Sequence, residues 1–250
     1  MKESIPFQEK FGELLRTNKF AIFLEIAVVF VPLYAGLILS DRLGSDVVPL
    51  GGNVVLLGGP LGYLGLVFSL AAVWVASKMR DVSWGEFGLA RPKSWVRTVL
   101  MGLGVLLAIL AGVVILVNPL IRAIPNIGPP DMSHFAPLSG NLPNLIINLV
   151  AVWFTAGFVE EFIWRGYLMN RLIDLQGKKT KLAWMIALVV SAIIFGLGHP
   201  YQDLAGIVQT GAVGLLFGVA FLIVRRNLWP LIIAHALIDT WSFVTHYFGG

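Results

Sequence analysis

The sequence predicts an all-α protein, a polytopic transmembrane helical bundle of about seven spans with an N-terminal helix on the membrane surface. Three observations predict this fold class. Hydrophobic residues make up 57% and charged residues only 13% of the 250 residues, and the mean hydropathy is +0.83, a balance that no soluble domain needs for its core. The apolar residues form runs long enough to cross a bilayer. The Lys and Arg residues fall almost wholly on one side of those runs.

Seven runs of the chain can cross a membrane as helices. A helix needs about 20 largely apolar residues to span a hydrocarbon core of roughly 30 Å. The runs are approximately residues 20–40, 61–77, 96–118, 144–168, 183–199, 205–224 and 228–247. Glycine and proline cluster between the first two runs and between residues 119 and 143, which predicts loops on the outer side. We therefore expect residues 1–250 to form one integral membrane domain.

The distribution of positive charge sets the expected orientation. Sixteen of the 18 Lys and Arg residues lie on one side of the predicted spans, and only Arg42 and Arg122 lie on the other. Because positive residues are retained in the cytoplasm, we expect a cytoplasmic N-terminus. The small size and single domain suggest a prokaryotic plasma membrane. The formal net charge of +4 is thereby assigned to topology and contact with membrane lipids, and no nucleic acid is expected as a partner.

The first 19 residues are too polar for the apolar region of a signal peptide. Phe7, Phe11, Leu14 and Leu15 fall at helical spacing on one face. This pattern predicts an amphipathic helix that lies on the inner leaflet.

Ionisable residues within the spans are the candidates for a functional site. A charge at the bilayer centre costs about 2.5–3.5 kcal/mol on insertion scales, so such residues usually face a protein interior. The chain has no cysteine, which excludes a thiol nucleophile and a thiolate zinc site. The candidates are Glu160 and Glu161 in the fourth span, His199 at the end of the fifth, and His235 and Asp239 in the seventh.

Helical spacing separates the roles of these residues. Glu161 and Arg165 are four apart and can form an ion pair. Glu160 is turned about 100° away from Glu161 and lacks such a local partner, which favours it as a general base. His235 and Asp239 also share a face, where they can hold one ion together or the carboxylate can orient the imidazole. The spacing leaves both uses open.

The segments EEFIWR, FGLGH and HALID, in this order on three apolar helices, resemble the signatures of the CPBP family. This family contains the CAAX prenyl proteases, with their Abi-like and type II CAAX prenyl endopeptidase relatives, and bacteriocin-processing intramembrane proteases. Its pattern is Glu-Glu-x-x-x-Arg, then Phe-x-x-x-His, then His-x-x-x-Asn or Asp. The positions that match are Glu160, Glu161, Arg165, Phe195, His199, His235 and Asp239. Residues 144–245 are the expected protease core.

The resemblance implies an endopeptidase that cuts a membrane-associated or lipidated peptide, such as a prenylated CAAX C-terminus. It implies that Glu160 and His199 activate a water and that His235, with Asp239, stabilises the oxyanion. Glu161, Arg165 and Phe195 would support these residues. Many relatives carry Asn at position 239, and an ionised Asp cannot donate a hydrogen bond, so Asp239 is expected to orient His235 or to bind a metal.

Metal dependence stays open at this stage. Glu160, His199, His235 and Asp239 would satisfy a divalent zinc ion chemically, which predicts a metalloendopeptidase. The same residues can also activate a water without a metal. Two other functions remain: a non-catalytic membrane scaffold or bacteriocin immunity factor, and, less favoured, a proton-coupled transporter, which also uses intramembrane carboxylates.

We expect the site to be a cavity near the middle of the membrane, open to the cytoplasm. Glu160 lies about 16 Å along its helix from Arg171, at 1.5 Å per residue, but His199 lies about 27 Å from Lys181. These depths conflict, and the sequence alone leaves the conflict open. His134, in the outer connection, is expected to have no role.

Overall fold

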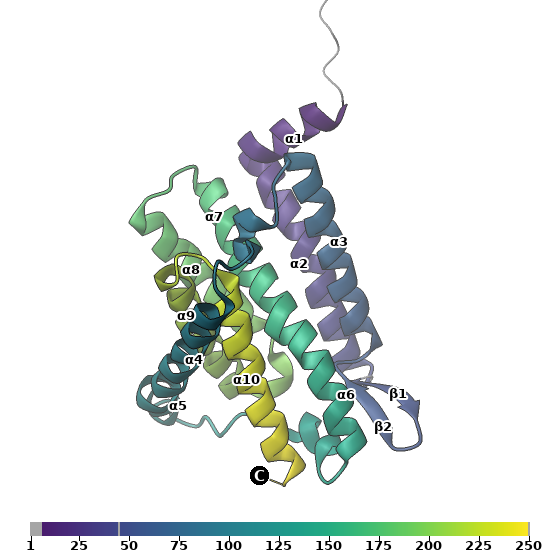
Figure 1. Cartoon of the computed structure of the whole chain (residues 1–250). Helices are drawn as coiled ribbons and strands as arrows, with labels where there is room; N and C mark the ends of the chain where they lie inside the picture. Colours follow the sequence, from purple (N-terminus) through teal and green to yellow (C-terminus); the bar gives the residue numbers. More distant parts are fainter. Residues whose placement is uncertain (1–6, 45, 250) are drawn as a thin grey trace, which may run out of the picture.

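A computed structural model describes residues 7–44 and 46–249 and shows a bundle of long helices (Figure 1). The elements are α1 (Phe7–Thr17), α2 (Lys19–Arg42), β1 (Val47–Gly51), β2 (Val54–Leu57), α3 (Pro60–Arg80), η1 (Gly85–Leu89), α4 (Trp95–Gly112), η2 (Val113–Val117), α5 (Asn118–Arg122), η3 (Ser133–Leu138), α6 (Leu142–Val152), η4 (Trp153–Leu168), α7 (Met169–Gln176), α8 (Lys181–Leu197), η5 (Pro200–Gln202), α9 (Asp203–Ile223) and α10 (Leu228–Tyr247).

Six helices are long and apolar enough to cross a membrane, by length and composition alone. They are Lys19–Arg42, Pro60–Arg80, Trp95–Arg122, Leu142–Gln176, Pro200–Ile223 and Leu228–Tyr247. The remaining expected span, 183–199, corresponds to α8, which is apolar but only 17 residues long. The predicted all-α polytopic bundle is therefore confirmed. The expected span 144–168 is longer than predicted, because α7 continues the same helix to Gln176.

Helix α1 is amphipathic, as predicted, but part of its apolar face packs on the bundle. Leu15 is buried against α2 and α3, and Gly12 is buried beside it. Phe7 and Leu14 remain exposed. Thus only part of the predicted face is available to a lipid surface, and residues 1–6 of the predicted surface helix lie outside the described residues.

Helices α2 and α3 pack side by side at a distance that only glycine permits at two positions (Figure 1). A Cβ atom on Gly36 would lie 2.3 Å from the carbonyl oxygen of Leu61, and one on Gly65 would lie 2.5 Å from that of Pro32. Small residues at helix contacts let backbones approach closely in membrane bundles. This pair of helices forms one wall of the fold.

The connection between α2 and α3, which the sequence analysis described only as a loop, contains an antiparallel hairpin of β1 and β2. Two buried asparagines of α6 hold its second strand. Asn144 Oδ1 accepts from the Val55 amide at 2.9 Å, and Asn148 Oδ1 accepts from the Leu57 amide at 2.8 Å. These bonds satisfy polar backbone groups that lie near the apolar bundle, and they fix the hairpin at one end of the molecule.

A buried cluster of ion pairs joins the helices at the end of the molecule opposite the hairpin. Glu25 of α2 is 7% exposed and contacts Arg171 at 2.7 Å and Arg80 at 3.3 Å. Tyr167 donates its hydroxyl to Glu25 at 3.0 Å, and Arg171 donates to the carbonyl of Leu15 at 2.9 Å. The cluster therefore ties α1, α2, α3, η4 and α7 together. The sequence offered a signal for it, since Glu25 is the one carboxylate in the run 20–40 and needs a partner there.

The central segment η4 is a π-helix of 16 residues, Trp153–Leu168. Its hydrogen bonds run from residue i to residue i+5, so successive side chains are spaced differently around the axis than in an α-helix. The side-chain directions predicted from α-helical spacing therefore apply only in part to this segment, although Glu161 and Arg165, four residues apart, do form the predicted ion pair. π-Helical turns occur frequently at functional sites, and η4 carries both Glu160 and Glu161.

The spacing at Gly36 gives a stability prediction. Gly36→Ala forces a Cβ atom into the backbone of α3, and we expect it to lower the free energy of unfolding by about 1–3 kcal/mol. Gly104→Ala in α4 is the matched control, because a Cβ there meets nothing within 4 Å. Thermal unfolding in detergent measures both. A Gly36→Ala protein that unfolds at the wild-type temperature would contradict the packing described for α2 and α3.

Candidate active site

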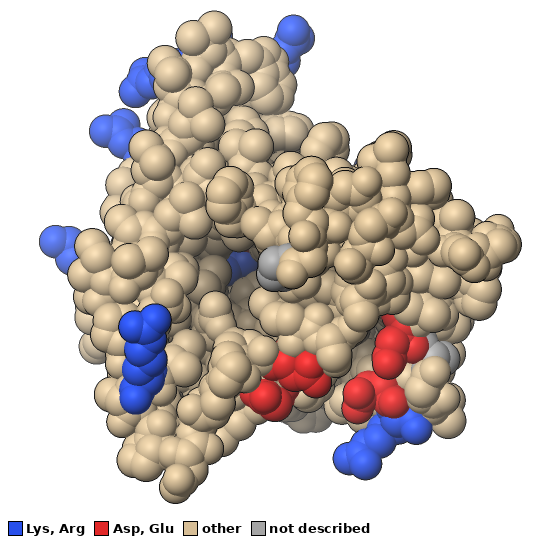
Figure 2. All heavy atoms as spheres, turned by 90° about the horizontal axis from the view of Figure 1, so that it is seen from below, with Lys and Arg blue, Asp and Glu red and all other residues tan. Residues whose placement is uncertain are grey.

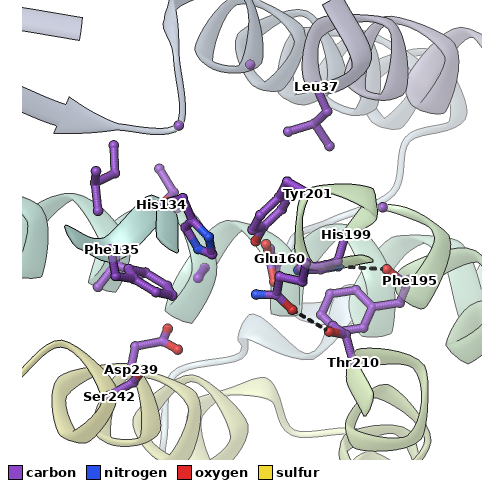
Figure 3. Close-up of a pocket in the computed structure, with 18 of the residues that line it drawn as sticks. Leu37, His134, Phe135, Glu160, Phe195, His199, Tyr201, Thr210, Asp239 and Ser242 are labelled. Atoms are coloured by element: carbon purple, nitrogen blue, oxygen red, sulfur yellow. Dashed lines mark hydrogen bonds between the residues drawn. The ribbon is translucent and has the colours of Figure 1, made fainter. Parts of the chain in front are cut away.

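A cavity of about 810 Å³ lies between the helices. It runs along α6 and η4 from Asn148 to Trp164 and is closed on its other sides by parts of α2, α3, α9 and α10. Figure 3 shows side chains from these elements pointing into the same space. The volume falls in the range typical of ligand pockets.

Five of the seven predicted site residues line this cavity: Glu160, Phe195, His199, His235 and Asp239. The other two, Glu161 and Arg165, lie behind its wall and are 0% and 2% exposed. The structure thus brings together all the residues that the resemblance selected. The different depths counted along the two helices do not separate Glu160, within η4, from His199, beyond the end of α8, because both line this one cavity.

The cavity opens on the face that carries the β-hairpin. Asp46 and Gly58 of the hairpin connection and His134 of η3 line this end, and α1 lies at the opposite end of the bundle (Figure 1). Figure 2 shows the hollow on this face. The cavity therefore opens at the end of the bundle away from α1, while the expected cytoplasmic N-terminus and the expected cytoplasmic opening both stay predictions.

The lining of the cavity carries a one-sided charge pattern. Its described residues include five carboxylates, Asp41, Asp46, Asp131, Glu160 and Asp239, and no Lys or Arg. Arg165, which the sequence analysis counted with the positive residues of the inner loop, is instead buried behind the wall. The cavity therefore suits neutral or cationic groups better than anions.

The Glu161 carboxylate connects the predicted site residues. One of its oxygens, Oε1, accepts from Arg165 at 2.9 Å and from Nδ1 of His235 at 2.8 Å. The Arg165 guanidinium also donates to the carbonyl of Gly214 at 3.2 Å. It lies 4.8 Å from the ring centroid of Phe195 and 5.2 Å from that of Phe217. The predicted ion pair of Glu161 with Arg165 is therefore confirmed, and it links η4 to α8, α9 and α10.

The carboxylate that binds His235 is not the one expected. The sequence analysis paired His235 with Asp239, four residues later in α10. The distance from His235 Nε2 to Asp239 Oδ2 is 3.7 Å, which is too long for a hydrogen bond. Glu161 orients the ring from the neighbouring helix, a contact across 74 positions that spacing within one helix could not reveal.

Hydrogen-bond partners fix the tautomers of both histidines. His199 Nδ1 lies 3.0 Å from the carbonyl oxygen of Phe195, and His235 Nδ1 faces the Glu161 carboxylate. A carbonyl and an ion-paired carboxylate can only accept, so each Nδ1 carries the hydrogen. In the neutral rings Nε2 is then an acceptor with a lone pair. His199 can therefore take a proton from a water at Nε2.

The four residues considered as zinc ligands do not fit a metal ion in this arrangement. Within residues 7–44 and 46–249, no three His, Asp or Glu side chains come close enough to bind one ion. Catalytic zinc sites use three protein ligands. We therefore derive no catalytic step through a metal.

Tyr201 was not among the predicted site residues, and His134, which was expected to have no role, also lines the cavity. His134 packs against the Tyr201 ring with centroids 4.7 Å apart, and Tyr201 contacts His199 at 5.6 Å. Burial lowers the pKa of His134 to about 4, although Asp131 acts in the opposite direction, so its ring is neutral at physiological pH. The signal for Tyr201 was its place two residues after His199, on the same tight turn.

Comparison with known proteins supports the assignment of the site. Residues 142–241 match the sequence model of the type II CAAX prenyl endopeptidase Rce1-like family. No curated protein and no solved structure shows a significant match to the chain. The matched segment contains all three motifs, from Glu160 to Asp239, and the helices that bring them to one cavity. Residues 142–241 of this integral membrane protein, here called the Rce1-like domain, are therefore similar to the type II CAAX prenyl endopeptidases.

Proposed function

We propose that the chain is an intramembrane endopeptidase that cuts a membrane-associated peptide with a water activated by Glu160 and His199. The observation that carries the proposal is the convergence of Glu160, His199, His235 and Asp239 on one cavity, from three separate segments of the Rce1-like domain. The cavity is large enough for several residues of an extended peptide.

We assign water activation to Glu160 and His199, because no hydrogen-bond donor in the described structure occupies the Glu160 carboxylate or Nε2 of His199. Within the described residues the Glu160 carboxylate makes no hydrogen bond, and His199 presents Nε2 with its lone pair. A carboxylate or imidazole in such a position can take a proton from an attacking water. Glu160 is the proposed general base, and His199 the second acceptor that orients the water.

Stabilisation of the oxyanion requires donors. His235 offers Nε2–H only as the imidazolium, since its Nδ1–H is bound to Glu161. The proposed form carries both protons, with its charge balanced by Glu161 and, 3.7 Å from Nε2, by Asp239. Donors that are fixed in place before the reaction stabilise the developing charge without reorganisation.

The charge pattern of the cavity bears on the substrate. A prenylated CAAX peptide ends in a free carboxylate three residues beyond the bond that is cut, and no Lys or Arg lines the cavity to pair with it. This favours an internal bond of a longer membrane-associated peptide. With the proposed cytoplasmic N-terminus, such a substrate would enter from the non-cytoplasmic side.

The first test of function is Glu160→Gln. We expect the detergent-purified wild type to cleave a lipidated peptide and the variant to lose at least about 100-fold in kcat, because the amide cannot act as a base. Glu9→Gln, on the exposed face of α1, is the matched control and should cleave normally. Mass spectrometry of peptides with a free and with an amidated C-terminus locates the cut.

Two results would decide against this function. Equal cleavage by wild type and Glu160→Gln would remove the assigned base. A cellular phenotype that survives Glu160→Gln would favour the alternative of a non-catalytic scaffold or immunity factor.

A second prediction concerns the buried ion pair. Glu161→Gln leaves the Arg165 guanidinium without its carboxylate, and loss of one partner of a buried pair costs about 3–5 kcal/mol of unfolding free energy. We expect the double variant Glu161→Gln/Arg165→Gln to recover part of this loss, since it removes the unpaired charge. Glu13→Gln in α1 is the exposed control. Chemical unfolding in detergent measures all three, and a double variant less stable than Glu161→Gln would argue against the pair.

A further inference from the structure

We propose that Tyr201 is a catalytic residue of the same site, whose hydroxyl donates a hydrogen bond to the carbonyl oxygen of the bond being cut. The inference rests on the proposed function and adds a residue outside the three motifs. Three features of the described structure lead to it: the shortage of donors among the motif residues, the uncommitted hydroxyl of Tyr201, and the way its ring is held.

The polar groups nearest the proposed chemistry are mostly acceptors. Glu160 and Asp239 accept when ionised, and His199 accepts at Nε2 because its Nδ1–H is bound to the Phe195 carbonyl. His235 donates at Nε2 only when it carries a second proton. Asp239 occupies the position at which many relatives carry Asn, whose side-chain amide could donate a hydrogen bond. A tetrahedral oxyanion in this cavity therefore needs at least one further donor.

Tyr201 is the tyrosine that can supply it. Three tyrosines line the cavity: Tyr34, Tyr63 and Tyr201. Tyr34 donates to the carbonyl of Ile194, and Tyr63 donates to the carbonyl of Leu57 at 2.6 Å. Across residues 7–44 and 46–249, the Tyr201 hydroxyl makes no hydrogen bond. Its donor is therefore available to a bound substrate.

The position of the Tyr201 hydroxyl suits this role. The ring lies between His134, at a centroid distance of 4.7 Å, and His199, at 5.6 Å. Figure 3 shows the ring of Tyr201 beside Glu160. Tyr201, Glu160 and Asp239 all line the same cavity, so a substrate bound there can meet the hydroxyl together with the carboxylates of the proposed reaction. Edge-on contact with the His134 ring and tilted contact with the His199 ring hold the tyrosine ring in place, as a preorganised donor requires.

In the proposed step the water oxygen bonds to the carbonyl carbon while Glu160 takes one of the water's protons. The electron pair of the C=O double bond moves to oxygen, which accepts hydrogen bonds from Tyr201 and from protonated His235. The electron pair of the oxyanion then re-forms the C=O double bond as the C–N bond breaks, the C–N electron pair leaves with nitrogen, and the proton held by Glu160 passes to that nitrogen. Tyr201 keeps its proton throughout.

Tyr201→Phe tests the inference, because it removes the hydroxyl and keeps the ring. We expect kcat on a peptide that the wild type cleaves to fall about 10- to 1,000-fold with KM changed less than about twofold, as for loss of one oxyanion donor. Tyr247→Phe, at the end of α10 and outside the cavity lining, is the matched control and should retain wild-type kinetics. Thermal unfolding in detergent checks that all variants fold.

The outcomes separate this inference from the proposed function. If the wild type cleaves, Glu160→Gln does not, and Tyr201→Phe equals the wild type, the inference fails while the peptidase stands. If Tyr201→Phe is active but Tyr201→Ala is not, the ring only positions its neighbours, and the inference fails again. If kcat is unchanged and KM rises, Tyr201 binds substrate without stabilising the oxyanion. If neither the wild type nor Glu160→Gln cleaves any peptide, both proposals fall.

Discussion

The Glu161 carboxylate accepts hydrogen bonds from Arg165 and His235 through a single oxygen, and the geometry of the site follows from this contact. Because Glu161 is fully buried, its charge must be balanced, and Arg165 balances it while packing between Phe195 and Phe217. Three helices that are distant in sequence are thereby held to η4. The same contact selects the tautomer of His235. Glu161, which does not line the cavity, thus sets the tautomer of His235, which does.

Much of the fold and of the candidate site could be predicted from the sequence. Hydropathy located the spans because a bilayer demands continuous apolar helices, and the cost of intramembrane charge pointed to Glu160, His199, His235 and Asp239. What spacing could not reveal were contacts between helices, such as Glu161 with His235, and departures from regular geometry, such as the π-helix η4. The roles of Asn144 and Asn148 were also not predicted, because their partner is a hairpin in a segment for which composition predicted only a loop.

The opening of the cavity lies at the end of the bundle away from α1. Counting residues from the positively charged helix ends placed Glu160 and His199 at different depths, and the sequence analysis sought a common site open to the cytoplasm. In the structure the cavity opens beside the hairpin and η3, and both residues line it. The absence of Lys and Arg from the described lining agrees with this position, since α1 and the α7–α8 connection, which are rich in Lys and Arg, lie toward the opposite end of the bundle (Figure 1). Charge, topology and access are therefore consistent with one another.

Side-specific labelling tests the central claim, a single cavity that holds the site residues and opens on the hairpin face, most directly. The chain contains no cysteine, so single cysteines can be introduced without background. Asp239→Cys reports the cavity, Asp46→Cys its mouth, and Lys179→Cys the opposite face, each in sealed vesicles treated with a membrane-impermeant maleimide. We expect Asp239→Cys and Asp46→Cys to react from the same side and Lys179→Cys from the other. Reaction of Asp239→Cys only from the side that labels Lys179→Cys would contradict the account.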